Sequence, residues 1–198
     1  MENKEIMIKA RESLKGHWGI AIGAVLLNAV ILIGIQIIPI AGKVIYLLIA
    51  GAMSLGLSTI MLSLVRGEET KIGHLFDGFS RFGTTLAALL LQTLFIILWM
   101  LLLIIPGIVA AYSYSMTFYI LVDDKYISSI DAIRKSKQMM MGNKWKLLCL
   151  SFRFFGWVLL AILTLGIGFI WVAPYMSVSF ARFYDDIKNT QSQEVFLA

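Results

Sequence analysis

The longest stretch without a charged residue covers residues 82–122 and contains the pair Pro106-Gly107. As one helix, these 41 residues would extend roughly 60 Å at about 1.5 Å per residue, twice the roughly 30 Å thickness of a bilayer's hydrocarbon core. Two helices that turn at the pair fit this thickness, because proline lacks an amide donor and glycine accepts turn geometry. The pattern therefore predicts a membrane hairpin with Pro106-Gly107 at its tip.

Apolar runs on both sides predict two more hairpins. In the first, helices over about residues 18–38 and 43–65 flank Pro39. In the last, helices over about residues 145–165 and 168–185 are separated by "TLGIG", so that Gly166 and Gly168 form the turn. One helix over residues 154–181 is the alternative and would give five crossings. It would extend roughly 42 Å at about 1.5 Å per residue with both glycines and Pro174 in its interior, so six crossings are favoured.

An internal similarity also favours six crossings. The sequence "AAYSYSMTFYILVDD" aligns without gaps, at an offset of 62 residues, with "VAPYMSVSFARFYDD". The segment "AGAMSLGLSTIMLSLVRGEE" has the same order of small, bulky and acidic residues. We predict three tandem units over about residues 1–66, 67–124 and 125–186, each containing a hairpin. Together they form one transmembrane domain, and residues 187–198 form a short, flexible cytoplasmic tail.

Each predicted hairpin follows an amphipathic segment: "EIMIKARESLKG", "KIGHLFDGFSRFG" or "SSIDAIRKSKQMMMGNKW". In the second segment, five apolar residues recur at the spacing of one α-helical face: Ile72, Leu75, Phe76, Phe79 and Phe82. Such helices lie in the membrane interface or pack beneath the bundle, and the two arrangements are compatible. The predicted fold is therefore all-α, with six transmembrane helices in three tandem hairpins, each preceded by an interfacial helix.

The distribution of charge predicts the orientation. With six crossings, sixteen Lys and Arg residues share one side: four in the N-terminal segment, three at 66–81, seven at 125–153 and two near the C-terminus. Lys43 alone lies on the other side, so the positive-inside rule places both termini in the cytoplasm. A hydrophobic content of 59% and a mean hydropathy of +0.84 are typical of an integral membrane protein. The basic residues then face anionic lipid headgroups, and a nucleic-acid partner is not expected.

Few residues offer catalytic or metal-binding chemistry. The single cysteine, Cys149, cannot form an internal disulfide. No His, Cys, Asp or Glu cluster has the spacing of metal ligands, so we expect neither a metal nor a cofactor. Two carboxylate pairs, Asp123-Asp124 and Asp185-Asp186, stand at predicted cytoplasmic helix ends. They are either solvated termini or two halves of a shared site for a cation or a partner.

Hydroxyl residues in the second helix of the hairpins recur at a spacing of four, as in Ser54/Ser58 and Ser113/Thr117. Small residues at this spacing let membrane helices approach closely, and helix packing is the simplest role. The alternative is a weakly polar central cavity, which suits a lipid or another hydrophobic ligand better than an ion. The candidates for either role are Ser54, Ser58, Tyr112, Ser113, Ser115, Thr117, Tyr175, Ser177 and Ser179.

Several motifs in this order resemble a known family: "ARESLKGHWGIAIG", "LFDGFSRFG", "LLLIIPGIVAAYSYSMTFYILVDD", "AIRKSKQMMMGNKW" and "LTLGIGFIWVAPYMSVSFARFYDD". The chain is similar over about residues 10–186 to an uncharacterised bacterial integral membrane family, the domain of unknown function nine-seven-five. This resemblance implies a multi-pass protein of the bacterial cytoplasmic membrane with about six helices. It implies no activity.

The residues favour a non-enzymatic membrane protein that binds or scaffolds lipids or partner membrane proteins. A second hypothesis is a transporter, or an accessory of export or immunity, for a hydrophobic or amphipathic substrate. An intramembrane enzyme is disfavoured, because it would need a nucleophile with a base, or a metal, at membrane depth. The predicted helices offer hydroxyl groups without bases.

Overall fold

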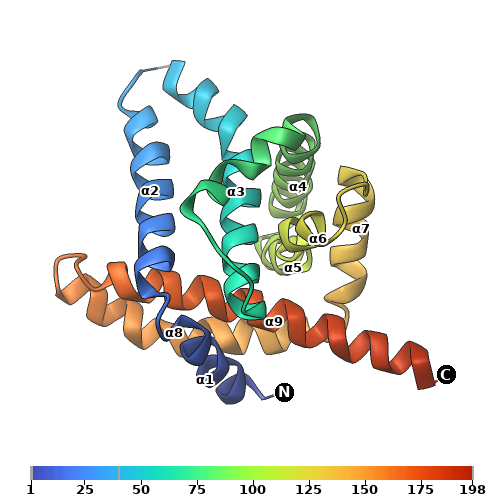
Figure 1. Ribbon diagram of the computed structural model, residues 1–198. Coiled ribbons are helices and arrows are strands. Elements are labelled where there is room, and N and C mark those ends of the chain that lie inside the picture. The colour runs from blue at the N-terminus through green and yellow to red at the C-terminus, as the bar shows by residue number, and fades with distance from the viewer. Residues whose placement is uncertain (1, 40, 198) are drawn as a thin grey trace.

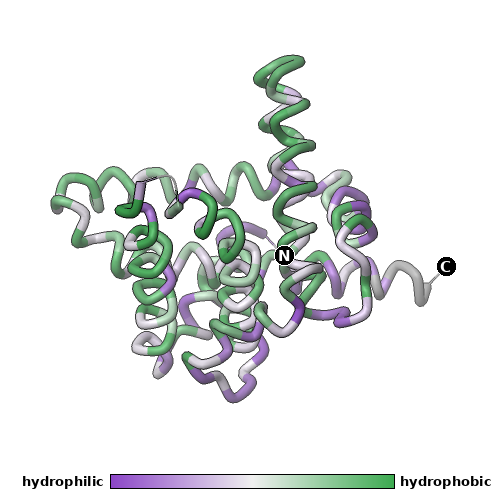
Figure 2. Tube along the Cα trace, turned by 90° about the horizontal axis from the view of Figure 1, so that it is seen from above, coloured by the Kyte–Doolittle hydropathy of each residue, from purple (hydrophilic) through white to green (hydrophobic). Residues whose placement is uncertain are grey.

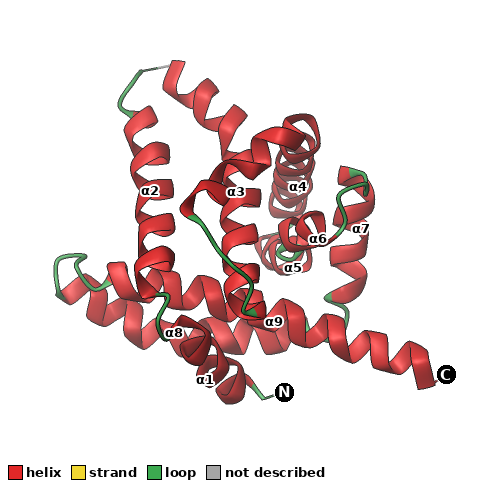
Figure 3. Ribbon diagram, in the orientation of Figure 1, coloured by secondary structure: helices red, strands yellow, loops and turns green. Residues whose placement is uncertain are grey.

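The structure, a computed structural model, describes residues 2–39 and 41–197, which fold into helices without a strand (Figures 1 and 3). Three pairs of consecutive helices pack together: α2 (Trp18–Gln36) with α3 (Ala41–Arg66), α4 (Phe82–Leu102) with α5 (Ile104–Tyr114), and α8 (Lys144–Leu163) with α9 (Phe169–Leu197). Helix α6 (Thr117–Asp123) continues α5. A shorter helix precedes each pair: α1 (Asn3–Leu14), the 3₁₀ helix η1 (Ile72–Arg81) and α7 (Ser129–Met139).

Five helical segments of the described chain are long and apolar enough to cross a membrane: Trp18–Gln36, Ala41–Arg66, Ile72–Leu102, Ile104–Asp123 and Lys144–Leu163. These segments are typical of a multi-pass membrane protein. Helix α9 is not among the five. Its apolar half is short, because Arg182 and the pair Asp185-Asp186 follow within about five turns of its start.

The three helix pairs point in different directions. In Figure 1, α2 and α3 stand upright, α8 and α9 lie across the picture with their connecting loop at the left, and α4 and α5 are seen nearly end-on. Figure 2 shows this last pair from the side, protruding at the top and coloured as apolar along most of its length. The loop ends of all three pairs are apolar and exposed, with Ile37 80%, Leu101 84% and Leu165 95% exposed. Apolar surface of this extent is typical of contact with lipid.

The turn of the middle pair differs from the prediction. Three of the five predicted turn residues lie between the helices of a pair: Pro39, Gly166 and Gly168. Between α4 and α5, however, the chain turns at Leu103, whose backbone is extended, and not at Pro106-Gly107. Pro106 lies in the first turn of α5, where its missing N–H group is tolerated because the first amides of a helix have no partner within it.

The C-terminal segment after the last core residues remains helical. Residues 187–198 were predicted to be a flexible cytoplasmic tail, and the described part of this segment continues α9 to Leu197. The start of this extension is part of the fold, because Ile187 is 3% exposed and the Lys188 ammonium forms an ion pair with Asp123. A buried apolar side chain and a charge pair therefore hold the start of the segment in place.

The helix of residues 104–123 is interrupted at Ser115 and Met116, which the sequence did not predict. Ser136 of α7 is completely buried beside this interruption. Its hydroxyl donates to the carbonyl of Ser113 (2.9 Å) and accepts from the amide of Met116 (3.2 Å). One side chain therefore satisfies two backbone groups that the break leaves without helical partners.

The η1 segment packs against α3 through a close backbone approach. A Cβ atom on Gly56 would lie 1.8 Å from the carbonyl oxygen of Leu75, and one on Gly78 would lie 2.0 Å from that of Ala52. Because a 3₁₀ helix has three residues per turn, Leu75 and Gly78 share the face toward α3. Phe76 and Phe79, predicted to lie on the same face as Leu75, are instead 47% and 39% exposed. The α-helical spacing assumed for this segment is therefore wrong.

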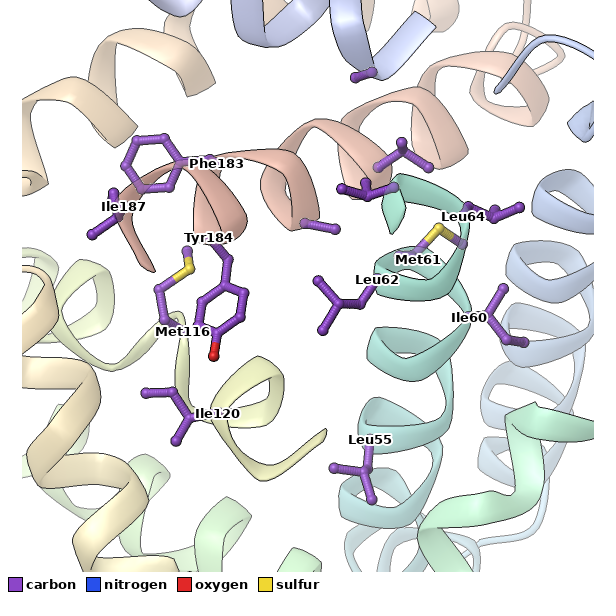
Figure 4. Packing of buried hydrophobic residues seen from close by; sticks show 14 of the residues in the cluster. Leu55, Ile60, Met61, Leu62, Leu64, Met116, Ile120, Phe183, Tyr184 and Ile187 are labelled. Atoms are coloured by element: carbon purple, nitrogen blue, oxygen red, sulfur yellow. The ribbon is translucent and has the colours of Figure 1, made fainter. Parts of the chain in front are cut away.

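The core lies where α3, α6 and α9 meet (Figure 4). Leu62 of α3, Ile120 of α6, and Phe183 and Tyr184 of α9 are at most 1% exposed. Each short helix covers one of these three helices, since η1 packs on α3, α7 on α6 and α1 on α9. Each short helix therefore packs on a helix of a neighbouring pair. Because α1 packs on α9, these contacts form a closed circle of three.

Candidate functional site

A cavity of about 440 Å³ lies between α3, the interrupted α5–α6 segment, α8 and α9. Its wall is formed by Ser54, Leu57, Ser58, Ala111, Tyr112, Ser115, Met116, Phe118, Tyr119, Leu147, Ser151 and Phe180. None of these described residues is charged. The interruption at Ser115 and Met116 places side chains of both α5 and α6 in the wall, so the break shapes the site.

Hydroxyl groups supply the polarity of the cavity. Ser115 donates to the carbonyl of Tyr112 (2.8 Å) and Ser151 to that of Leu147 (3.0 Å), so both hydroxyls satisfy carbonyls of their own helices. Ser54 and Ser58, one helical turn apart on α3, make no hydrogen bond to another described residue. Because a hydroxyl both donates and accepts, these two can bind a neutral polar group that enters the cavity.

Two stacked tyrosines separate the cavity from a charged cluster. Tyr119 lines the cavity, and its ring stacks on that of Tyr184 with centroids 5.5 Å apart. The Tyr184 hydroxyl donates to a carboxylate oxygen of Asp123 at 2.7 Å. A change at either tyrosine can therefore alter both the cavity and the charged cluster.

The charged cluster joins three helices. The guanidinium of Arg66, at the end of α3, donates to Asp123 at the end of α6 (2.7 and 3.1 Å) and to Asp185 in α9 (2.8 and 3.2 Å). Lys188 adds an ammonium to Asp123. Two cations thus balance two carboxylates. The side chains are 27% exposed for Arg66, 12% for Asp123 and 14% for Asp185, so the cluster is partly shielded from water.

The other members of the two carboxylate pairs lie elsewhere. Asp124 accepts the backbone amides of Tyr126 and Ile127 (3.0 and 3.1 Å) and so stabilises the turn after α6. Asp186 is 7% exposed and pairs with the Lys146 ammonium at 3.0 Å. Of the shared site considered from the sequence, one carboxylate from each pair comes together, around the guanidinium of Arg66.

A comparison with known protein families identifies the family of this chain. The family described as "Protein of unknown function (DUF975)" matches residues 1–111 and 100–191. The chain belongs to this family. No curated protein and no solved structure matches it. Among the described residues of this DUF975 chain, no group of three or more His, Cys, Asp or Glu side chains is placed to hold a metal ion.

The predicted hydroxyl and tyrosine residues of the DUF975 chain separate into three groups. Four line the cavity: Ser54, Ser58, Tyr112 and Ser115. Four donate to backbone carbonyls three or four residues earlier: Ser113, Ser177 and Ser179 within their own helices, and Thr117 across the break to Tyr114 of α5. Tyr175 lies apart, with its hydroxyl on the carbonyl of Met7 (3.1 Å).

The sequence did not single out Tyr119, Ser151, Phe180 or Arg66 as site residues. Phe180 could have been found, because it corresponds to Phe118 at the offset of 62 residues. The partners of Arg66 lie 57 and 119 positions away. Only the arrangement of whole helices brings this DUF975 chain's arginine to both carboxylates, so no local pattern could reveal the cluster.

Proposed function

We propose that this protein is a non-enzymatic protein of the bacterial cytoplasmic membrane that binds a neutral lipid, or the neutral part of a lipid, in the central cavity. In this proposal the three helix pairs, which point in different directions in Figure 1, align along the membrane normal, so that α9 is a sixth crossing, the loop ends face outward and both termini are cytoplasmic. Binding of the lipid would hold the three helix pairs in one arrangement. Partner membrane proteins would recognise that arrangement.

Two observations support a structure of three repeated hairpin units. The short helices cover α3, α6 and α9 in turn, as expected when each unit places its first helix on the last helix of a neighbour. Sequence positions also correspond: Ser58, Ser115 and Ser177 align at offsets of 57 and 62 residues. The Arg66 cluster then joins the same end of all three units. That end is cytoplasmic under the positive-inside rule.

The neutrality of the cavity wall carries the proposal. The wall contains no charged side chain, and burying a charge there without a partner would cost several kcal/mol. The wall combines aromatic and aliphatic surface with the free hydroxyls of Ser54 and Ser58. Apolar walls with a few convergent polar groups are typical of small-molecule sites. A lipid whose bound portion carries hydroxyl, ester or amide groups fits this chemistry.

Retention of lipid by purified protein tests the proposal. The protein is extracted in mild detergent, washed extensively, and examined by native mass spectrometry and by lipid extraction. Wild-type protein should retain about one neutral lipid. Ser58→Phe should lose it, because the phenyl ring fills the cavity. Thr93→Phe places the same ring at an exposed position of α4 and should retain the lipid.

Folding is checked by thermal unfolding of each variant in the same detergent. If Ser58→Phe does not fold, the double variant Ser54→Ala and Ser58→Ala removes only the two hydroxyls and should weaken retention while preserving the fold. A folded Ser58→Phe protein that retains as much lipid as the wild type would show that the cavity is not the binding site.

One observation favours transport as a second candidate function. The cavity contacts the Arg66 cluster through Tyr119 and Tyr184, so opening the cluster would alter the cytoplasmic end of the site. A transporter for hydrophobic substrates would use this coupling as a gate. In proteoliposomes, a transporter would move a fluorescent diacylglycerol between leaflets at a rate that Arg66→Gln changes, whereas a binding protein would not move it.

A further inference from the structure

Two smaller cavities lie at junctions between helix pairs. One, of about 250 Å³, lies where α1 and the start of α2 meet α8 and α9, and is lined by Arg11, Trp18, Trp157, Trp171, Val172 and Tyr175. The other, of about 140 Å³, lies where α7 and the start of α8 meet α4 and α5. Its lining includes Trp99, Val109, Ala110, Ser113, Lys137 and Lys144.

The two cavities occupy corresponding positions in the sequence. Val109, Ala110 and Ser113 of the second cavity become Trp171, Val172 and Tyr175 of the first when 62 is added. Lys137 and Lys144 likewise become Arg11 and Trp18 when 126 is subtracted. Four elements therefore contribute to each cavity from matching places, and both cavities contain a basic residue from the short helix. This agreement indicates that the same kind of cavity occurs at two junctions of the repeated units.

The side chains of both cavities are rich in hydrogen-bond donors. No Asp or Glu lines either cavity, and Arg11, Lys137 and Lys144 form no ion pair with another described residue. Arginine, lysine and the indole N–H groups of tryptophan only donate. In the first cavity, the Tyr175 hydroxyl proton is already used on the carbonyl of Met7. A cationic ligand is disfavoured beside these charges, whereas an anion with several acceptor oxygens satisfies them.

The surroundings of the two cavities indicate which kind of anion they bind. Trp99, Trp157 and Trp171 are about half exposed, and their helices continue outward into exposed apolar surface. Tryptophan prefers the depth of lipid headgroups, and basic residues on interfacial helices attract anionic lipid. A phosphate at this depth, with acyl chains along the exposed helix pair, matches both the charged and the apolar parts of each cavity.

We propose that the Arg11 cavity and the Lys137/Lys144 cavity each bind the phosphate of a membrane phospholipid. The inference requires only that the exposed apolar helix pairs face lipid, and it does not depend on a ligand in the central cavity. The phosphate oxygens accept from the basic side chain, and the glycerol backbone lies against the indole rings. Each lipid would fill the junction between neighbouring helix pairs.

Native mass spectrometry of delipidated protein tests this inference with three probes: phosphatidylglycerol, diacylglycerol and inorganic phosphate. Wild-type protein should bind two phosphatidylglycerol molecules about tenfold more tightly than diacylglycerol, which corresponds to about 1.4 kcal/mol. Arg11→Gln should weaken one of the two binding steps, and the double variant Lys137→Gln and Lys144→Gln the other. Lys15→Gln and Lys125→Gln, which change the same charge at exposed positions outside both cavities, should preserve both steps.

Arg11→Lys keeps the charge and should restore most of the affinity that Arg11→Gln loses, which separates a headgroup contact from a change in folding. Equal binding of phosphatidylglycerol and diacylglycerol would overturn the inference. Binding of inorganic phosphate as tight as that of the lipid would assign the sites to soluble phosphate and overturn the lipid. Ser58→Phe should leave both binding steps unchanged, so that this test and the test of the central cavity fail independently.

Discussion

Arg66→Gln is expected to destabilise the protein by about 2 to 3 kcal/mol. The variant removes the cation that both carboxylates share: Asp123, 12% exposed, keeps Lys188, whereas Asp185, 14% exposed, loses its ion-pair partner. Breaking a fully buried pair costs about 3–5 kcal/mol, and breaking an exposed pair about 0–1 kcal/mol. The guanidinium makes four hydrogen bonds, but 27% of its side chain is exposed. Water can therefore replace part of what is lost, and the cost lies between the two limits.

Thermal unfolding in mild detergent measures this cost. For a chain of this size, about 1 kcal/mol corresponds to roughly 2–4 °C in midpoint temperature, so Arg66→Gln should lower the midpoint by roughly 4–12 °C. Asp185→Asn should lower it as well, and the double variant should lose less than the sum of the two, because the pair couples. Lys71→Gln breaks an ion pair with Glu69 whose members are 72% and 84% exposed, and it should shift the midpoint by less than about 4 °C.

The cluster would have no structural role if Arg66→Gln unfolded at the same temperature as Lys71→Gln. An additive double variant would separately show that Arg66 and Asp185 do not interact in the membrane protein.

Three further changes test the packing and the topology. Leu90→Arg, at an exposed position of α4, should reduce membrane insertion, because arginine at the centre of a transmembrane helix costs about 2.5–3.5 kcal/mol; normal membrane levels would contradict this placement. Gly56→Ala should lower the thermal midpoint through overpacking of about 1–3 kcal/mol or more, because the new methyl group would lie 1.8 Å from a carbonyl oxygen of η1; an unchanged midpoint would refute the close contact. In a protein without Cys149, a cysteine at Asn189 should resist a membrane-impermeant thiol reagent in intact cells, whereas one at Lys43 should react; labelling at Asn189 would exclude six crossings.

Helix positions could be predicted from the sequence where hydrophobicity alone decides them. The bounds expected for the first two helices, 18–38 and 43–65, differ from α2 and α3 by at most two residues. The turn at Leu103 was missed because Pro106 has two favourable places, in a turn or in the first turn of the helix that follows. The pattern of a single sequence cannot distinguish these two places for Pro106.

The cavity was only partly predictable, because the spacing of hydroxyl residues identifies a helix face but not its neighbour. Ser54 and Ser58 lie on one face of α3 and do line the cavity. Ser113 and Thr117 have the same spacing, but both hydroxyls donate to backbone carbonyls of α5. The difference arises at the break after α5, which depends on Ser136, 23 residues beyond Ser113. Contacts over such separations have no local sequence signal.

The closed circle of short helices has a consequence for biogenesis. The apolar face of α1, formed by Ile6, Ala10 and Leu14, is completely buried in the folded protein, largely beneath α9, which is synthesised long after α1. At about 5–20 residues per second, the ribosome needs roughly 8–30 s to travel from the end of α1 to the start of α9. Throughout this interval the face must be covered by something other than its final partner, and an amphipathic helix can rest on the membrane surface meanwhile. The nascent chain would therefore first hold α1 on the membrane and exchange this lipid contact for a protein contact only after α9 has been synthesised.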